Sequence, residues 1–267
     1  MDKFKNKLAL VTGASSGIGK EIAHKLAAEG CHLILVARRN LVLIQLASQL
    51  QSQFGIRCEV ISADLAAAEC VALIVEQVNT LNLQVDILVN NAGFGTYGLF
   101  ETISPSSEQD EIAVNIAALV GLTHAFIPGM LKRGSGSVLN IASTAAFQPV
   151  AFLAVYAATK AFVLSFSEAL WGEYQGRGIH VVALCPPAVD TEFASKLGNN
   201  SIKRTSSFSK PITAEHVAAQ AIQVLKRAGP SYIIGFKNWL MANSLRFAPR
   251  SLVARASAAL LRPSSQK

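Results

Sequence analysis

Short apolar runs alternate with longer segments of helical spacing along most of the chain. The apolar runs are rich in Val, Ile and Leu, and they predict strands at 8–12, 32–37, 57–62, 86–90, 136–142, 179–185 and 231–236. Several are apolar throughout rather than alternating, which is typical of strands that are covered on both faces. Between them, apolar positions three and four residues apart predict helices at 17–29, 40–54, 66–80, 107–132, 156–175 and 213–228.

This succession of strands and helices predicts an α/β fold. Strands that alternate with helices pair in parallel through right-handed crossovers, which gives a doubly wound sheet with helices on both faces, in three layers. A chain of 267 residues fits one large domain better than two small ones. We therefore expect a single domain over 1–236, followed by a C-terminal extension over 237–267.

A glycine-rich turn, with the spacing G-x-x-x-G-x-G, joins the first predicted strand to the first predicted helix. Glycines let the backbone approach a pyrophosphate, and the helix start offers free N–H groups and a partial positive charge. A tight turn alone would also need glycine, but this position in the chain favours phosphate binding. The residues expected to contact a dinucleotide are Gly13, Ser15, Ser16, Gly17, Ile18 and Gly19.

Arg38 and Arg39 follow the second predicted strand, where NAD-selective folds usually carry an acidic residue. A guanidinium fork matches a phosphate with two hydrogen bonds, so we predict a preference for NADP(H) over NAD(H). The alternative is a solvated arginine pair at a strand end. After the third predicted strand, Asp64 could cap the next helix or face the adenine amino group.

Tyr156 and Lys160 are four residues apart at the start of a predicted helix and therefore share one face. A nearby ammonium would lower the pKa of the Tyr156 phenol from about 10, so that it could exchange a proton near neutral pH. A Y-x-x-x-K pair alone is common. Ser143, however, ends a predicted strand 13 residues earlier, and ligands bind at the carboxyl ends of parallel strands.

In family order and spacing, these motifs resemble the short-chain dehydrogenase/reductase family, classical type, over residues 6 to about 192. The residues that carry the resemblance are the glycine motif 12–19, Asp64, Asn90 to Gly93, Asn115, Ser143, and Tyr156 to Lys160. The resemblance implies a Rossmann fold with a seven-stranded parallel sheet. It also implies an enzyme that transfers a hydride between a nicotinamide dinucleotide and a carbonyl or alcohol.

The resemblance implies a role for each catalytic residue. Tyr156 would be the general acid in reduction and the base in oxidation, and Ser143 would polarise the substrate carbonyl. Lys160 would hold the nicotinamide ribose and lower the pKa of Tyr156. Asn115 would bind a water of the proton relay; an Asn amide can also interrupt the helical hydrogen-bond ladder, and both roles can hold together.

The resemblance also adds cofactor contacts. Asn91, Ala92 and Gly93 would lie on the adenosine side, while Pro186, Val189 and Thr191 would lie at the nicotinamide end, beside Tyr156 and Lys160. The family often carries glycine where this chain has Pro187, and proline fixes φ near −65°, so the loop could sit differently. No metal ligand set is expected.

The expected pocket walls are 94–97, 145–153, 187–188 and the polar segment 191–212. They are mostly apolar through Phe94, Phe147, Phe152 and Phe193, which favours a hydrophobic ketone or aldehyde over a phosphorylated sugar. A 3-oxoacyl thioester is a second substrate class. A non-catalytic dinucleotide sensor or scaffold is the alternative from another function class, although such a protein would not need the acid–base residues.

Charge is concentrated at the C-terminus. Six of the seven net positive charges lie from Lys237 to Lys267, where no acid occurs, so a general nucleic-acid surface is not expected. Segment 237–262 predicts two amphipathic pieces broken before Pro249. These could pack on protein, at a neighbouring subunit or the substrate cleft, or make peripheral contact with an anionic membrane.

Location and assembly are the last expectations. The four cysteines are scattered, which favours buried, reduced thiols in a cytoplasmic protein that could also be membrane-associated. We find no run of about 18 uncharged apolar residues and no signal-peptide pattern. The family resemblance suggests a homodimer or homotetramer joined through 107–132 and 156–175.

Overall fold

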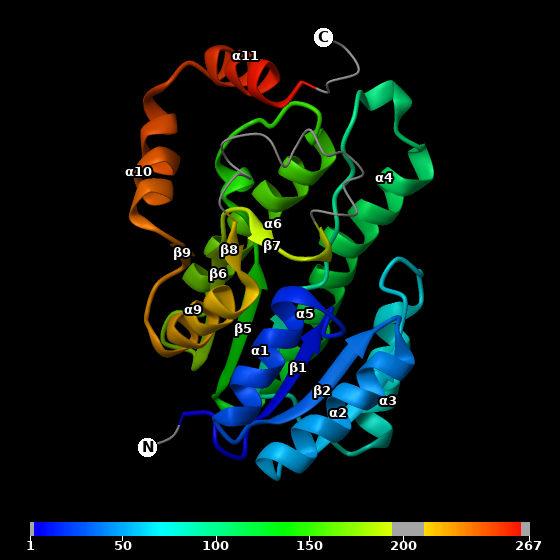
Figure 1. Cartoon of the computed structure of the whole chain (residues 1–267). Helices are drawn as coiled ribbons and strands as arrows, with labels where there is room; N and C mark the ends of the chain where they lie inside the picture. Colours follow the sequence, from blue (N-terminus) through cyan, green and yellow to red (C-terminus); the bar gives the residue numbers. More distant parts are fainter. Residues whose placement is uncertain (1–2, 194–210, 263–267) are drawn as a thin grey trace.

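The structure is a computed structural model that describes residues 3–193 and 211–262. It confirms the three-layer α/β fold with a seven-stranded parallel sheet (Figure 1). The strands of this sheet are β1 Leu8–Thr12, β2 His32–Ala37, β3 Cys58–Ser62, β4 Ile87–Asn90, β5 Gly136–Ile141, β6 Ile179–Cys185 and β9 Ser231–Ile233. Their order is β3-β2-β1-β4-β5-β6-β9, so the chain changes direction across the sheet between β1 and β4, where such folds bind their ligands.

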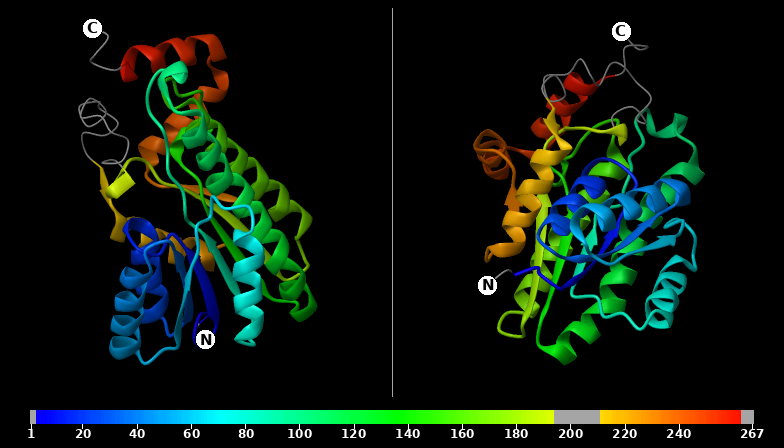
Figure 2. Two further views of the ribbon diagram at one scale, coloured as in Figure 1. Left: turned by 90° about the vertical axis from the view of Figure 1, so that its right-hand side faces the viewer. Right: turned by 60° about the horizontal axis from the view of Figure 1, so that its bottom comes forward.

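Helices cover both faces of the sheet (Figure 2). They are α1 Gly17–Ala28, α2 Asn40–Phe54, α3 Cys70–Thr80, α4 Pro105–Ile112, α5 Leu119–Arg133, α6 Ala154–Glu173, α9 Ala214–Lys226, α10 Phe236–Ser244 and α11 Arg250–Leu261. Helices α1, α2 and α9 share one core with the sheet, and α3 and α5 share the other. Helices α10 and α11 lie at the end of the molecule opposite the N-terminus (Figures 1 and 2).

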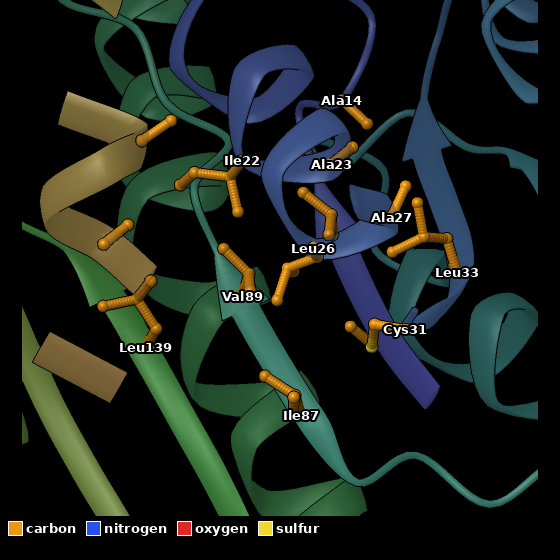
Figure 3. Close-up of a cluster of buried hydrophobic side chains, with 14 of the residues drawn as sticks. Ala14, Ile22, Ala23, Leu26, Ala27, Cys31, Leu33, Ile87, Val89 and Leu139 are labelled. Carbon is orange, nitrogen blue, oxygen red and sulfur yellow. The ribbon is translucent and has the colours of Figure 1, made fainter. Parts of the chain in front are cut away.

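Successive strand residues enter opposite cores because side chains alternate across a strand. Val89 packs toward α1, whereas its neighbour Leu88 packs toward α3 and α5. Figure 3 shows Ile22 and Leu26 of α1 lying over Val89 and other strand side chains. Each fully buried aliphatic side chain of this kind contributes about 1.5–3 kcal/mol to folding. The continuously apolar strands are therefore explained by burial on both faces.

Most predicted elements differ from the structure by no more than two residues at either end, and three differences have a clear structural cause. The helix predicted over 107–132 begins at Pro105 and contains a π-helical turn over Ala113–Ala118, between α4 and α5. The helix predicted from residue 66 begins at Cys70, because 65–69 form a turn. The strand predicted over 231–236 ends at Ile233, since Gly235 takes a φ of 90° and α10 follows at once.

The continuous helical segment Pro105–Arg133 is long and apolar enough to cross a membrane, by length and composition. We did not expect any such segment from the sequence. In the fold, its residues Leu122, Ile127 and Met130 are buried in the core shared with the sheet. The segment thus contributes a helix to the sheet-covering layer, and 33% of its most apolar window is buried there.

Two short strands, β7 Val189–Asp190 and β8 Ile212–Thr213, pair in parallel. They bring together the two ends of the polar segment predicted over 191–212. Residues 194–210 of that segment lie outside the described residues.

Candidate active site

The glycine turn lies at the carboxyl end of β1, against the end of β4. Thr12 Oγ1 accepts hydrogen bonds from the backbone N–H groups of Asn91 and Ala92, both at 3.0 Å, and Asn91 Nδ2 donates to the Thr12 carbonyl at 2.9 Å. A Cβ atom on Gly19 would lie 2.5 Å from the Gly13 carbonyl oxygen, and Gly13 itself has a φ of +67°. Glycine is therefore required at both positions.

The start of α1 is suited to an anion. The helix begins at Gly17, and the preceding residue, Ser16, makes no side-chain hydrogen bond that would cap it. The first-turn N–H groups and the positive end of the helix dipole therefore stay available for a phosphate. The close glycine packing and this uncapped helix start fit the pyrophosphate of a dinucleotide.

Both arginines after β2 border the same cavity as the glycine turn. Arg39 Nε donates to Ser15 Oγ at 3.1 Å, and Arg39 Nη1 donates to both carboxylate oxygens of Glu192 at 3.1 Å. Arg38 Nη1 lies 3.9 Å from the Asp64 carboxylate. Two guanidinium groups thus stand at the adenosine end of the cavity.

Asp64 does not cap helix α3, contrary to one of its two predicted roles. Its Oδ1 accepts a hydrogen bond from the Ala66 N–H at 3.1 Å and so caps the turn before the helix, which begins only at Cys70. Asp64 does border the cavity, and its contact with adenine stays a prediction.

Ser143, Tyr156 and Lys160 lie together at the carboxyl ends of the central strands, on the wall of that cavity. Ser143 follows β5, and its hydroxyl accepts a hydrogen bond from the Ala145 N–H at 3.1 Å. The Ser143 hydroxyl also lies beside the Tyr156 phenol and lowers its pKa. Lys160, one turn after Tyr156 on α6, donates from Nζ to the Ile141 carbonyl at 2.9 Å.

The pKa of Tyr156 is raised, not lowered as the sequence suggested. Burial raises the pKa of the phenol to about 12; the Ser143 hydroxyl opposes this rise, and the nearby Glu111 adds to it. Lys160 Nζ lies 5.8 Å from the centre of the Tyr156 ring and is held by a backbone carbonyl, and burial lowers its own pKa to about 8. Loss of hydration is therefore the largest influence on the pKa of this phenol.

Asn115 lies within the π-helical turn, and its amide joins three parts of the fold. Its Nδ2 donates to the Phe94 carbonyl at 2.9 Å and to Thr159 Oγ1 at 3.0 Å, while its Oδ1 accepts from the Phe94 N–H at 3.2 Å. The helical irregularity is what an inward-bonding Asn favours. Its role in binding a relay water stays a prediction.

Glu111 is a buried carboxyl group near the site that the sequence did not single out. One oxygen accepts hydrogen bonds from the N–H and the hydroxyl of Thr96, at 2.9 and 2.8 Å. The other oxygen has no hydrogen-bond partner among the described residues. Burial raises the pKa of Glu111 to about 7, against the lowering effects of Thr96 and Lys160. The signal available in the sequence was its position four residues before Asn115, which places the two side chains on one face of the predicted helix.

The segment after β6 lies at the other end of the cavity. Pro186 accepts a hydrogen bond from the Thr144 N–H at 3.0 Å, which holds this segment beside the strand end that carries Ser143. The side chain of Thr191 lies 3.0 Å from the position that a Cβ on Gly17 would occupy. Thr191 therefore stands beside the start of α1, between the expected phosphate and nicotinamide positions.

Nearly all the predicted site residues border one cavity of about 1280 Å³. Gly19 and Asn115 do not border it. Gly19 allows the close packing of the glycine turn, and Asn115 bonds the backbone at Phe94. The cavity extends from the glycine turn, past the wall that carries Tyr156, to an apolar end near Phe94, Tyr97 and Phe193. Two predicted wall residues are not there: Phe147 packs in a separate core cluster, and Phe152 packs on Tyr97 with its ring centre 6.3 Å away.

The C-terminal helices cover this apolar end, which is one of the alternatives left open by the sequence. Tyr97 Oη donates to the Leu261 carbonyl at 2.6 Å, and Ser257 Oγ accepts from the Ala151 N–H at 2.8 Å. The cavity-facing side chains of the two helices and their connection include Met241, Leu245, Leu252 and Leu260. The tail thus forms part of the wall of the site.

The comparison with known proteins agrees with this geometry. Residues 7–201 match the short chain dehydrogenase family. The chain belongs to the short-chain dehydrogenase/reductase family. This short-chain dehydrogenase is similar to a solved structure, a short-chain dehydrogenase from Sphingobium yanoikuyae in complex with NADPH. The identity is 30% and the TM-score is 0.82, over 92% of this chain and 94% of that one.

Two relatives are similar in sequence. A very-long-chain 3-oxoacyl-CoA reductase of Anas platyrhynchos is 35% identical over 216 residues, which are 79% of this chain and 66% of that protein. An uncharacterized oxidoreductase of Staphylococcus epidermidis is 32% identical over 233 residues, which are 87% of this chain and 96% of that protein. The chain therefore spans slightly less than two thirds of the Anas reductase.

Proposed function

We propose that this short-chain dehydrogenase is an NADP(H)-dependent oxidoreductase that interconverts a hydrophobic carbonyl compound and its alcohol. The observation that carries the proposal is the position of Ser143, Tyr156 and Lys160 on one cavity wall, between a dinucleotide groove and an apolar pocket. A protein that only bound the dinucleotide would not need a half-buried phenol beside a serine hydroxyl on this cavity wall.

The residues of the chain account for the proton chemistry. With a pKa of about 12, the Tyr156 phenol is protonated at neutral pH and can donate its proton to a carbonyl oxygen during reduction. The Ser143 hydroxyl, beside the phenol, would orient and polarise that oxygen. When bound, the nicotinamide supplies or accepts the hydride. Lys160 would hold the ribose next to it.

The proposed preference for NADP(H) rests on Arg38 and Arg39. They stand after β2 beside Ser15 of the glycine turn, and a guanidinium fork suits the extra phosphate of NADP(H). The similarity to a structure that contains NADPH supports the same choice. Two acids lie near this pair, Glu192 at 3.1 Å from Arg39 and Asp64 at 3.9 Å from Arg38, and both ion pairs are partly exposed.

The proposed substrate is a hydrophobic ketone or aldehyde, because the far end of the cavity is bordered by aromatic and aliphatic side chains. A 3-oxoacyl thioester is the second candidate. The similarity to a very-long-chain 3-oxoacyl-CoA reductase favours it, as does the row of leucines that α11 adds to the wall.

The test is the consumption of NADPH and of NADH with a panel of aromatic and long-chain aldehydes and ketones and a 3-oxoacyl thioester. We expect faster turnover with NADPH, and with apolar carbonyls rather than phosphorylated sugars. Tight NADPH binding without turnover of any carbonyl would instead favour a sensor or scaffold.

We also propose that the protein forms a homodimer or homotetramer through α4, α5 and α6. Phe162 on α6 is partly exposed and stacks on Phe166, with the ring centres 5.7 Å apart, which leaves an apolar strip on this helix. Light scattering of Phe162→Glu against the unmodified chain tests this. A fall to a monomer supports the interface, and an unchanged mass contradicts it.

A further inference from the structure

Helices α10 and α11 and the turn between them present two different apolar faces. Met241 and Leu245 point into the cavity wall. Phe236, Trp239, Leu240 and Phe247 do not border the cavity and are all exposed, Trp239 by 48% and Phe247 by 91%. Phe236, Trp239 and Leu240 are spaced three and four residues apart on α10 and so share one side of that helix, and Phe247 follows in the turn after it. We refer to them as the outer face of α10.

The outer face of α10 is organised rather than a scatter of exposed side chains. Phe236 and Trp239 stack on one another with their ring centres 5.9 Å apart. Phe247 follows at the bend between the two helices, where it projects from a short 3-10 turn over Leu245–Phe247. Exposed apolar side chains gathered along one short segment, two of them stacked, mark a surface that contacts another phase or molecule.

Cations surround the outer face of α10. Lys237 and Arg246 flank it along the same segment, and Arg250, Arg255 and Arg262 lie on α11 and at its end. All five are exposed, and none makes an ion pair within the described residues. The chain contains no Asp or Glu after Glu215, so no carboxylate of this segment offsets them.

On α11 the two sides of the helix differ as well. The α11 residues that border the cavity are Leu252, Val253, Ala256, Ser257, Leu260 and Leu261. Arg255 lies on the other side of the helix, and Arg250 and Arg262 stand at its two ends, so the exposed cations lie outside this row.

We propose that the outer face of α10, together with these five cations, binds the surface of an anionic phospholipid bilayer. Aromatic side chains lie well at the boundary between headgroups and acyl chains, and Lys and Arg attract anionic headgroups. A second copy of this chain fits this surface poorly. A symmetric contact would bring five cations of one copy against five of the other with no carboxylate between them.

Binding to a bilayer would give the substrate a route into the site, a step that rests on the proposed function. Leu252 and Leu260 border the cavity and are still 60% and 66% exposed, so the apolar wall continues to the surface of α11. With the outer face of α10 on a bilayer, the mouth of the cavity would lie at the lipid boundary. A long-chain carbonyl could then enter without crossing water.

The test uses the full chain and vesicles of phosphatidylcholine, with and without phosphatidylserine. A Trp171→Phe variant leaves Trp239 as the only tryptophan, since the chain contains two. We expect co-sedimentation with the anionic vesicles, at least tenfold weaker binding to the neutral ones, and a loss of binding at high salt. We also expect a blue shift of the Trp239 emission and its quenching by brominated lipid.

The decisive variant is Trp239→Ser with Phe247→Ser in the otherwise unmodified chain. Leu41→Ser on α2, where Leu41 is 76% exposed, is the matched control for the loss of a surface hydrophobic side chain. We expect the double variant to lose at least tenfold in vesicle binding and the control to bind like the unmodified chain. Equal binding by the double variant, or no binding of the full chain to anionic vesicles, overturns the proposal.

Two further readouts separate the alternatives. Analytical ultracentrifugation shows whether the double variant changes the oligomeric state; loss of a dimer in that variant would assign the outer face of α10 to a second copy and overturn the membrane proposal. Turnover of a small, water-soluble carbonyl should be the same in the unmodified chain and the double variant. If that activity is absent from both while vesicle binding holds, the proposed reaction fails and the membrane surface stands.

Discussion

Arg39 and Glu192 form an ion pair with two hydrogen bonds of 3.1 Å, which joins the end of β2 to the segment that follows β7. Both side chains are partly exposed, so the pair itself adds little to stability. Its importance is positional, because it holds a guanidinium beside Ser15 of the glycine turn. The phosphate that distinguishes NADP(H) from NAD(H) would meet this group and could replace the carboxylate.

Replacing both arginines, Arg38→Ala with Arg39→Ala, should weaken NADPH binding by roughly 10- to 100-fold, since hydrogen bonds to charged groups contribute about 1.5–3 kcal/mol. NADH binding should change little. Fluorescence titration with each dinucleotide measures this. Glu192→Gln is the matched control: it keeps both arginines and should leave NADPH binding as tight as before or tighter. An unchanged ratio of NADPH to NADH affinity in the double variant would refute the role of the arginines.

Gly19→Ala should abolish dinucleotide binding, because the new Cβ would lie 2.5 Å from the Gly13 carbonyl and force the turn open. Gly172→Ala on α6 is the control, since its Cβ would have nothing within 4 Å and alanine suits a helix better by up to about 1 kcal/mol. Calorimetric titration with NADPH, with circular dichroism to verify folding, compares the two. Wild-type affinity in a folded Gly19→Ala variant would contradict this account of the turn.

Glu111 should make the free energy of unfolding depend on pH. Burial raises its pKa from 4.5 to about 7, so the folded chain binds a proton that the unfolded chain releases between these values. This contribution is complete below about pH 4.5 and is lost as the pH rises through about 7. We expect Glu111→Gln to show a smaller fall in stability over this window in urea unfolding. Identical pH profiles for the two chains would show that Glu111 is not the group responsible.

The apolar wall formed by α11 should select for chain length. Each additional CH2 buried there contributes about 0.8 kcal/mol, so kcat/KM should rise roughly three- to fourfold per carbon until the wall is filled. Leu252→Asp and Leu260→Asp should remove this trend and leave short carbonyls little affected. Leu81→Asp, just after the end of α3 and outside the cavity wall, serves as the control. If the length dependence survives in both wall variants, α11 does not contact the substrate.

Most of the fold and most positions of the site could be predicted from the sequence. Strand and helix periodicity predicted the seven strands, and the spacing from Gly13 to Lys160 predicted which strand ends would meet. This succeeds because the carboxyl ends of parallel strands share one edge of the sheet, so a residue just after a strand is placed by topology alone.

What the sequence missed depends on long-range contacts. The pKa of Tyr156 follows from burial, which spacing along one helix does not reveal. Glu111 occupies a position on a predicted helix where a carboxylate is normally solvated, and only the approach of Thr96 makes it part of the site. The tail could have packed in several places, and the bonds of Ser257 and Leu261 place one of its sides against the substrate cleft.

The central claim is that Tyr156 donates the proton in a reductase reaction. The most direct measurement is single-turnover oxidation of bound NADPH by a hydrophobic ketone in the unmodified chain and in Tyr156→Phe, with the NADPH affinity of both determined in parallel. We expect the variant to bind NADPH within a fewfold of the unmodified chain and to lose at least about 10²-fold in rate. A variant that binds NADPH and turns over at the unmodified rate would contradict the assignment of Tyr156 and the mechanism built on it.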